Sequence, residues 1–257
     1  MPRSVVKERV PPIRVVCAND ASPNPEGRFV LDWMNASRRP TWTYALDRAV
    51  ELAGDLGKPL LIVETLSSGD RWASDRNHAF VLEGMADNKA ACKSRDVRYY
   101  PFVESERGEA VDLVASLAAL SCAVLTDDFP IRSFSADVAQ VAGRIGVRME
   151  RVDSNGLLPL RAADRVFPTA YAFRRFLQRT LPDHLPDAPR ANPLARLDFP
   201  RLRGLPREIT RRWPPASSKL LSADAAALRR LPIDHEVGRV NATGGPSVAR
   251  KRLKKFV

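Results

Sequence analysis

The stretch FVLDWM at residues 29–34 is the first of several short apolar runs that decide the fold. Four further runs follow: LLIVETL at 60–66, VRYYPFV at 97–103, CAVLT at 122–126 and VRMERV at 147–152. Several of them are apolar on successive residues, a pattern typical of strands that are covered on both faces. Segments with helical periodicity separate the runs. This alternation predicts a parallel sheet with helices packed on both of its faces.

The segments between the runs begin and end as helices do. The first carries an apolar stripe at three- and four-residue steps and ends at Gly57. Ser74 or Asp75 can cap the second, and segments 109–121 and 136–145 complete the series. Right-handed crossovers then favour the α/β class, as a Rossmann-like, doubly wound, five-stranded parallel sheet.

The pattern changes near residue 156, after which proline is frequent and the alternation of strands and helices stops. We therefore expect two units. Residues 1–155 form an α/β domain, and residues 156–257 form a basic, Pro-rich, partly helical C-terminal extension.

The extension contains one clear predicted helix, at residues 169–181. Arg174, Arg175 and Arg179 form its basic face and are candidate contacts for DNA or for a protein partner. Residues 244–257 are predicted to begin another helix.

The charge of the chain is unevenly distributed. The net charge is +11, yet residues 1–150 carry 19 basic and 21 acidic side chains, whereas residues 151–257 carry 22 and 9. A basic half favours a nucleic-acid partner, because clustered guanidinium groups neutralise phosphates. Arg outnumbers Lys 33 to 8, so a generally Arg-rich proteome explains the asymmetry equally well.

The composition is that of a globular protein, with 44% hydrophobic and 28% charged residues. No apolar run approaches the roughly 18 residues that a bilayer-spanning helix needs, so we expect no membrane association. The first twenty residues have no apolar core behind their positive charges, which argues against a secretory signal and for a cytoplasmic location.

Motifs of the common catalytic and metal-binding classes are missing. The sequence has no Gly-rich phosphate loop of the dinucleotide or P-loop kind and no nucleophile-elbow motif. His78, His184 and His235 are far apart and lack Cys or carboxylate neighbours at ligand spacing, so we expect no metal site. Trp33 and Trp42 are expected to pack in the core rather than to carry redox chemistry. We assign no catalytic residue.

Polar residues that follow the runs are the candidates for a ligand site, because ligands of doubly wound sheets bind outside the carboxyl ends of the strands. Asn, Asp and Ser at these places can also simply cap helices and form turns. The candidates follow the first, fourth and fifth runs and are Asn35, Ser37, Arg38, Thr126, Asp127, Asp128, Asp153 and Asn155.

Several stretches resemble one known family. They are NPEGRFVLDWMNASRR at 24–39, GKPLLIV at 57–63, WASDRNHAFVLEGM at 72–85, TDDFP at 126–130 and, most specifically, VDSNGLLPLRAADRVFPTAYAFRRFL at 152–177. The segment LPIDHEV at 231–237, with Gly244, Gly245 and the helical 250–256, adds to the likeness. Together they are similar to bacterial class II-like deoxyribodipyrimidine photolyases, from about residue 12 onward. Asp32 departs from that pattern, since a tyrosine is expected there.

The resemblance implies the N-terminal α/β antenna domain and interdomain linker of a DNA photolyase, without the FAD-binding catalytic domain that follows in the family. Photolyases repair cyclobutane pyrimidine dimers in DNA with light and FAD, and their α/β domain can hold an antenna chromophore of the deazaflavin or folate type. We expect this chain alone to bind at most the antenna chromophore and to lack repair activity. Two alternatives are a subunit that docks with a separately encoded FAD-binding domain, and a stand-alone nucleotide- or nucleic-acid-binding module.

Overall fold

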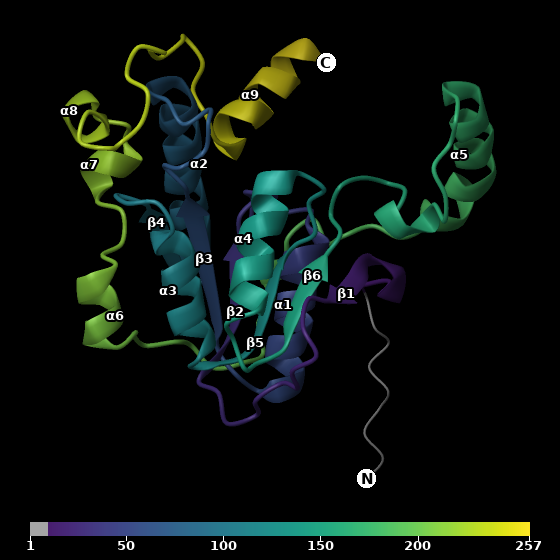
Figure 1. Cartoon of the computed structure of the whole chain (residues 1–257), viewed down its shortest axis with the longest axis horizontal. Coiled ribbons are helices and arrows are strands. Elements are labelled where there is room, and N and C mark those ends of the chain that lie inside the picture. The colour runs from purple at the N-terminus through teal and green to yellow at the C-terminus, as the bar shows by residue number, and fades with distance from the viewer. Residues whose placement is uncertain (1–9) are drawn as a thin grey trace.

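The protein, seen in a computed structural model, has a central sheet with helices on both faces (Figure 1). The structure describes residues 10–257, so the first nine residues of the predicted α/β domain lie outside the described residues. In the described part, the last strand ends at Val152 and the chain then continues in helices, turns and extended segments. The division of the chain at residue 155 stays a prediction.

The sheet has six strands in the order β1-β6-β5-β2-β3-β4. They are β1 (Val15–Cys17), β2 (Phe29–Met34), β3 (Leu60–Leu66), β4 (Arg98–Val103), β5 (Ser121–Asp127) and β6 (Met149–Val152). The five strands from β2 to β6 are parallel, which confirms the predicted α/β class and the doubly wound sheet. The sixth strand, β1, pairs antiparallel with β6 at the edge. Its three residues are too short a pattern for the sequence to reveal.

Two helices cover each face of the sheet. On one face lie α1 (Tyr44–Leu56) and α2 (Asp75–Lys93), and on the other lie α3 (Glu109–Ala118) and α4 (Arg132–Ala142). Two predicted helix ends, at Gly57 and at Ser74, are confirmed. Gly57 ends α1 in the left-handed conformation, with φ 59°, and the Ser74 side chain accepts a hydrogen bond from the Asn77 backbone N–H at the start of α2.

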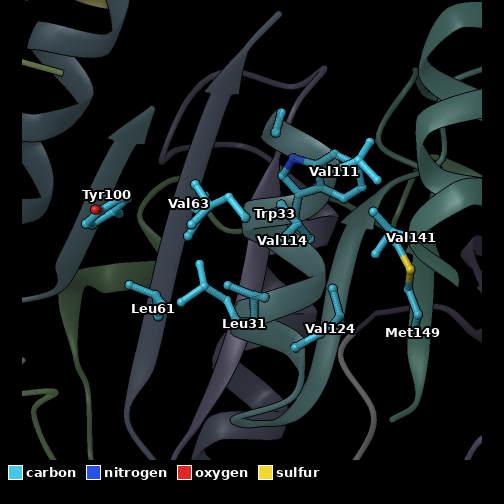
Figure 2. Close-up of a cluster of buried hydrophobic side chains, with 14 of the residues drawn as sticks. Leu31, Trp33, Leu61, Val63, Tyr100, Val111, Val114, Val124, Val141 and Met149 are labelled. Carbon is cyan, nitrogen blue, oxygen red and sulfur yellow. The ribbon is translucent and has the colours of Figure 1, made fainter. Parts of the chain in front are cut away.

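Each face of the sheet has its own apolar core. Figure 2 shows the core under α3 and α4, in which side chains of five strands meet those of the two helices. Trp33 is buried there, and its indole N–H donates to Thr65 Oγ1 at 2.9 Å. The opposite core lies under α1 and the C-terminal end of α2. Burial on both faces explains why the strands read as continuous apolar runs.

The expectation that Trp42 packs in the core is wrong. Trp42 precedes α1 rather than lying on its stripe, and 54% of the residue is exposed. Its φ of 52° is unusual for a bulky residue. The Trp42 backbone N–H donates to the carbonyl oxygen of Arg190 at 3.0 Å, which fixes the turn to the C-terminal extension.

The C-terminal extension wraps around the α/β part and completes its cores. Leu194 and Phe199 pack in the core under α1, Trp213 packs in the core under α3, and Leu228 packs against α2. The extension contains η2 (Leu160–Ala162), α5 (Ala170–His184), η3 (Pro193–Ala195), α6 (Arg207–Arg212), α7 (Ser218–Leu221), α8 (Ala225–Leu228) and α9 (Pro246–Phe256), while η1 (Pro12–Arg14) precedes β1.

Helix α9 is attached to α2 through two glycines. A Cβ on Gly244 would lie 1.9 Å from the Phe80 carbonyl oxygen, and one on Gly245 would lie 2.5 Å from a carboxylate oxygen of Asp87. The approach to the Phe80 backbone requires glycine at 244, and the φ of 97° favours glycine at 245. Asp87 also accepts the backbone N–H of Ser247 at 2.9 Å, so α2 supplies an acceptor for the first turn of α9.

Among residues 10–257, no helix combines the length and the hydropathy that a membrane crossing needs.

Candidate ligand-binding site

A cavity of about 430 Å³ lies beyond the carboxyl ends of β3 and β4. The β2–α1 loop, the β3–α2 loop, the N-terminal half of α2, the start of α3, and α4 line it. Helices from both faces of the sheet therefore border one space. Ligands of doubly wound sheets bind outside the carboxyl ends of the strands, and the loop after β2 and helix α4 after β5, the two strands at which the strand order reverses, both border this cavity. The volume is in the range of small-molecule sites, about 300–1,000 Å³.

Arg38 is held at the wall of this cavity by a buried carboxylate. Its guanidinium donates to Glu64 Oε1 at 3.1 Å and to the carbonyl oxygen of Thr65 at 2.7 Å. Glu64 is fully buried, and its Oε2 accepts from the Tyr99 hydroxyl at 2.5 Å and from Asn88 Nδ2 at 2.8 Å. Burial, followed by the negative charge of Glu64, raises the pKa of Tyr99 well above its usual value, so Tyr99 stays a donor. The network fixes a cation at the edge of the cavity.

His78 is the buried group in the cavity wall without a partner. Only 2% of the residue is exposed, and neither ring nitrogen has a hydrogen-bond partner among the described residues. Burial lowers the pKa of His78 to about 4, and nearby backbone groups of Ser74 and Ser67 oppose the shift only in part. The imidazole is neutral at pH 7 and offers one donor and one acceptor. A buried imidazole without a well-formed hydrogen bond can donate or accept one with a molecule in the cavity.

Glu104 joins the two loops that border the cavity. This buried carboxylate accepts from the Ser67 hydroxyl at 2.6 Å and from the Ser68 N–H at 3.1 Å. Its other oxygen accepts backbone N–H groups at the start of α3, from Gly108 at 3.1 Å and Ala110 at 3.0 Å. Burial and the charge of Glu104 raise the pKa of Asp137, which faces the cavity from α4. The lining thus combines fixed cations, a neutral imidazole and a carboxyl group.

Aromatic and basic side chains form the rim. Trp72 is 64% exposed, and the Arg71 guanidinium carbon lies 4.2 Å from the centroid of its ring. Arg107 crosses the β3–α2 loop at Gly69, where an added Cβ would lie 2.8 Å from Arg107 Cγ. An exposed indole beside guanidinium groups is a surface on which a flat ring can stack.

Of the eight candidate site residues from the sequence, Arg38 lines this cavity. Four others lie between β2 and β5. Asp127 Oδ2 accepts the backbone N–H groups of Asn35, Ala36 and Ser37 at 3.4, 2.9 and 2.9 Å, and the Thr126 hydroxyl donates to the backbone at 2.9 Å. Asp127 therefore shapes the loop that carries Arg38. Ser37 and Asp127 also border a void that is too narrow for a water molecule.

The remaining three candidates meet at the end of β6, away from the cavity. Asp153 is fully buried and accepts the backbone N–H groups of Asn155 at 3.0 Å and Leu160 at 2.6 Å. Asn155 Nδ2 donates to the Asp128 carbonyl oxygen at 2.6 Å, and the Asp128 carboxylate pairs with Arg161. These contacts organise the turn into the extension. A ligand role for these residues stays a prediction.

The sequence reasoning missed most of the cavity lining because it used the ends of only three of the five strands. Ser67 follows β3 and Glu104 follows β4, so the same rule applied to the second and third apolar runs names both. His78 and Asp137 lie inside helices and carry no such signal. Only the packing of α2 and α4 around one space brings them together.

Metal binding has no support in the described part of the chain, where no group of three or more His, Cys, Asp or Glu side chains could hold an ion. The cavity instead offers hydrogen-bond donors, an imidazole, an arginine and an aromatic rim. This set can bind and orient a planar polar molecule by stacking and hydrogen bonding.

Sequence comparison shows a relative. Over 169 residues the chain is 28% identical to a deoxyribodipyrimidine photo-lyase of Methanothermobacter thermautotrophicus. This homology supports the photolyase family. The match covers 65% of the chain but 37% of that photolyase, so the chain spans little more than a third of the relative. No family profile matches the sequence.

Two solved structures match parts of the chain at low identity and low TM-score. One is an archaeal photolyase from Sulfolobus tokodaii with two FAD molecules, at 12% identity and a TM-score of 0.45, covering 59% of this chain and 34% of that one. The other is a universal stress protein in complex with cAMP, at 16% identity and a TM-score of 0.32, covering 50% of this chain and 99% of that one.

Proposed function

We propose that this chain is the N-terminal α/β part of a photolyase-like protein and that the 430 Å³ cavity holds its antenna chromophore. The observation that carries the proposal is His78, a buried imidazole without a partner in the wall of a cavity at the carboxyl edge of a doubly wound sheet. The photolyase homology supplies the class of ligand. A bound deazaflavin or folate would supply absorption of near-ultraviolet or blue light.

The residues of the site would hold such a molecule without chemistry of their own. The Trp72 ring stacks on one face of the chromophore, and Arg38 donates to an oxygen or ring nitrogen at its edge. His78 donates or accepts one hydrogen bond deeper in the cavity. Because Glu64 already positions Arg38, little ordering is needed on binding, and this favours affinity.

The test is an absorption spectrum of the purified chain in the near-ultraviolet and blue, before and after addition of a deazaflavin or a reduced folate. We expect saturable binding of one of the two, with a shifted absorption band and partial quenching of tryptophan fluorescence through Trp72 at the rim. His78→Leu should weaken binding roughly tenfold, because it removes one hydrogen bond inside a buried site. His184→Leu on α5 is the matched control and should bind like the wild type.

Equal affinities in the wild type and His78→Leu would refute the assignment of the cavity. A spectrum that stays unchanged with both pigments would refute the antenna role altogether. Deoxyribodipyrimidine photo-lyase activity belongs to the relative. For this chain, that activity and the binding of FAD and DNA are part of the proposal.

A second candidate function rests on α5. The helix has no buried residue and stands away from the sheet and its helices (Figure 1). The rings of Phe167 and Phe176 lie 4.8 Å apart beside it. Arg174, Arg175 and Arg179 give it a positive face. Such a projecting helix fits contact with DNA or with a separately encoded FAD-binding domain.

Salt dependence separates these two partners. Binding of a fluorescent DNA duplex by the wild type should fall steeply with salt, and the triple replacement of Arg174, Arg175 and Arg179 by Gln should reduce the log–log slope by up to about 2.7. Arg28→Gln, a change of an exposed arginine elsewhere, should keep the slope. If the triple variant binds the duplex as the wild type does, α5 is not a DNA contact. A purified FAD-binding domain that binds the wild type but not the triple variant would instead make α5 the docking helix.

A further inference from the structure

A second cavity, of about 450 Å³, lies between the β4–α3 connection and the extension. It does not share lining residues with the first cavity, although the loop after β4 borders both. Its floor is apolar and consists of Phe102, Val103, Pro214, Pro215, Ala216, Leu220, Ala227 and Leu231.

The outer wall of this cavity is firmly attached to the sheet. The Tyr100 hydroxyl donates to the Trp213 carbonyl oxygen at 2.5 Å, and the Ala216 N–H donates to the Pro101 carbonyl oxygen at 2.8 Å. Leu228 and other leucines of α7 and α8 are buried against α2. The cavity is therefore preformed and does not depend on a ligand to hold its walls apart.

Three cations from three different segments border the apolar floor. Arg212 ends α6, Lys219 lies in α7, and Arg230 follows α8. None of them has a carboxylate partner within the described residues. The Arg212 guanidinium carbon lies 4.4 Å from the centroid of the Trp213 ring, which orients it without neutralising its charge.

The two acidic side chains of the lining already accept hydrogen bonds from nearby groups of the protein. Glu109 Oε2 accepts from the backbone N–H of Ser105 at 2.8 Å, the Ser105 hydroxyl at 2.9 Å and the Glu106 N–H at 2.9 Å. Asp224 Oδ1 accepts the Ala227 N–H at 3.0 Å as the cap of α8. The cavity thus offers apolar contact below, and above it three cations against two carboxylates, a net positive charge that no ion pair among the described lining residues neutralises.

We propose that this second cavity binds a small organic anion, with an apolar body on the floor and a carboxylate, sulfonate or phosphate group between Lys219 and Arg230. The proposal does not rest on the antenna function. The two cavities differ in kind, because the first is lined by buried polar groups such as His78 and Glu104, whereas the second places its charges only at the exposed rim.

The probe for the test is 8-anilinonaphthalene-1-sulfonate, whose fluorescence rises in an apolar site. We expect saturable binding at low salt with one probe per chain. The double variant Lys219→Gln/Arg230→Gln should bind at least about tenfold more weakly, since two charges that attract the sulfonate are lost. Arg229→Gln is the matched control, because it removes an exposed neighbouring cation that does not line the cavity.

Two comparisons make the result decisive. N-phenyl-1-naphthylamine, the same body without the sulfonate, should bind the wild type and the double variant equally. Ala227→Phe, which places a ring in the cavity at the apolar floor, should weaken binding of both probes strongly. The proposal is overturned if Lys219→Gln/Arg230→Gln binds the sulfonate as tightly as Arg229→Gln does. It is also overturned if His78→Leu alone removes binding, because that result would place the probe in the first cavity. Thermal unfolding of each variant confirms that it is folded.

Discussion

Glutamine in place of Glu64 removes the buried negative charge that holds Arg38 at the first cavity. Glu64 accepts three donors, from Arg38, Asn88 and Tyr99. A glutamine keeps one acceptor oxygen and turns the other position into an N–H donor, which then faces another donor. Breaking a buried ion pair on one side costs about 3–5 kcal/mol. Because the Arg38 side chain is 22% exposed and can reach water, we expect a loss near the lower end, about 3 kcal/mol.

Urea unfolding followed by circular dichroism measures this loss. For a chain of 257 residues the slope of unfolding free energy is about 3 kcal/mol per M urea, so the midpoint should fall by about 1 M. Arg38→Met should cost at least as much, about 3–5 kcal/mol, because it leaves the fully buried Glu64 carboxylate without a cation. The double variant should be more stable than the sum of the two single losses predicts, with a coupling energy of about 1–2 kcal/mol.

Glu106→Gln is the control, since Glu106 is exposed and its replacement should change the unfolding free energy by no more than about 0.5 kcal/mol. A loss in Glu64→Gln as small as in this control would refute the reasoning. Strict additivity of Glu64→Gln and Arg38→Met would show that the two side chains do not interact in solution.

Three further changes test other parts of the structure. Burial, and then the charge of Asp127, raises the pKa of Asp32, so the unfolding free energy falls as pH rises toward that raised pKa. Asp32→Asn should therefore unfold at higher urea concentration than the wild type at pH 8 but not at pH 4. The pKa of His78 is lowered to about 4, so the unfolding free energy falls as pH drops from about 6.5 toward about 4. In urea titrations, His78→Leu should make the unfolding free energy nearly independent of pH over that range. Gly244→Ala should detach α9 and speed amide exchange there, measured by mass spectrometry, whereas Gly238→Ala, with open space around its Cβ, should not.

The sequence carries enough information for the sheet because burial on both faces leaves continuous apolar runs. Each of the five runs became a strand with ends shifted by at most about two residues. Two features escaped it for physical reasons. The edge strand β1 is three residues long, and the position of Trp42 depends on a turn that a distant carbonyl group holds.

The candidate site was less accessible to sequence reasoning. The sequence identified Arg38 as a ligand-site candidate because it follows a strand in the chain. Asp127 and Asp153 also lie at strand ends, but their carboxylates accept hydrogen bonds from the backbone of loops and so stabilise those loops. His78 becomes a candidate only once α2 is seen to face the cavity, because nothing in its sequence neighbours distinguishes it from a core histidine. Long-range packing therefore decides the site more than local pattern does.

The wrapping of the extension has a consequence during synthesis on the ribosome. The side chains that close the cores at Leu194, Trp213 and Leu228 are made after the whole sheet. Translation of the roughly 80 residues from the end of β6 to Leu228 takes about 4–16 s at about 5–20 residues per second. For that time the finished strands expose apolar grooves that no later part of the chain yet covers. A nascent chain stalled before Trp213 should therefore bind holdase chaperones, and one stalled well beyond Leu231 should release them.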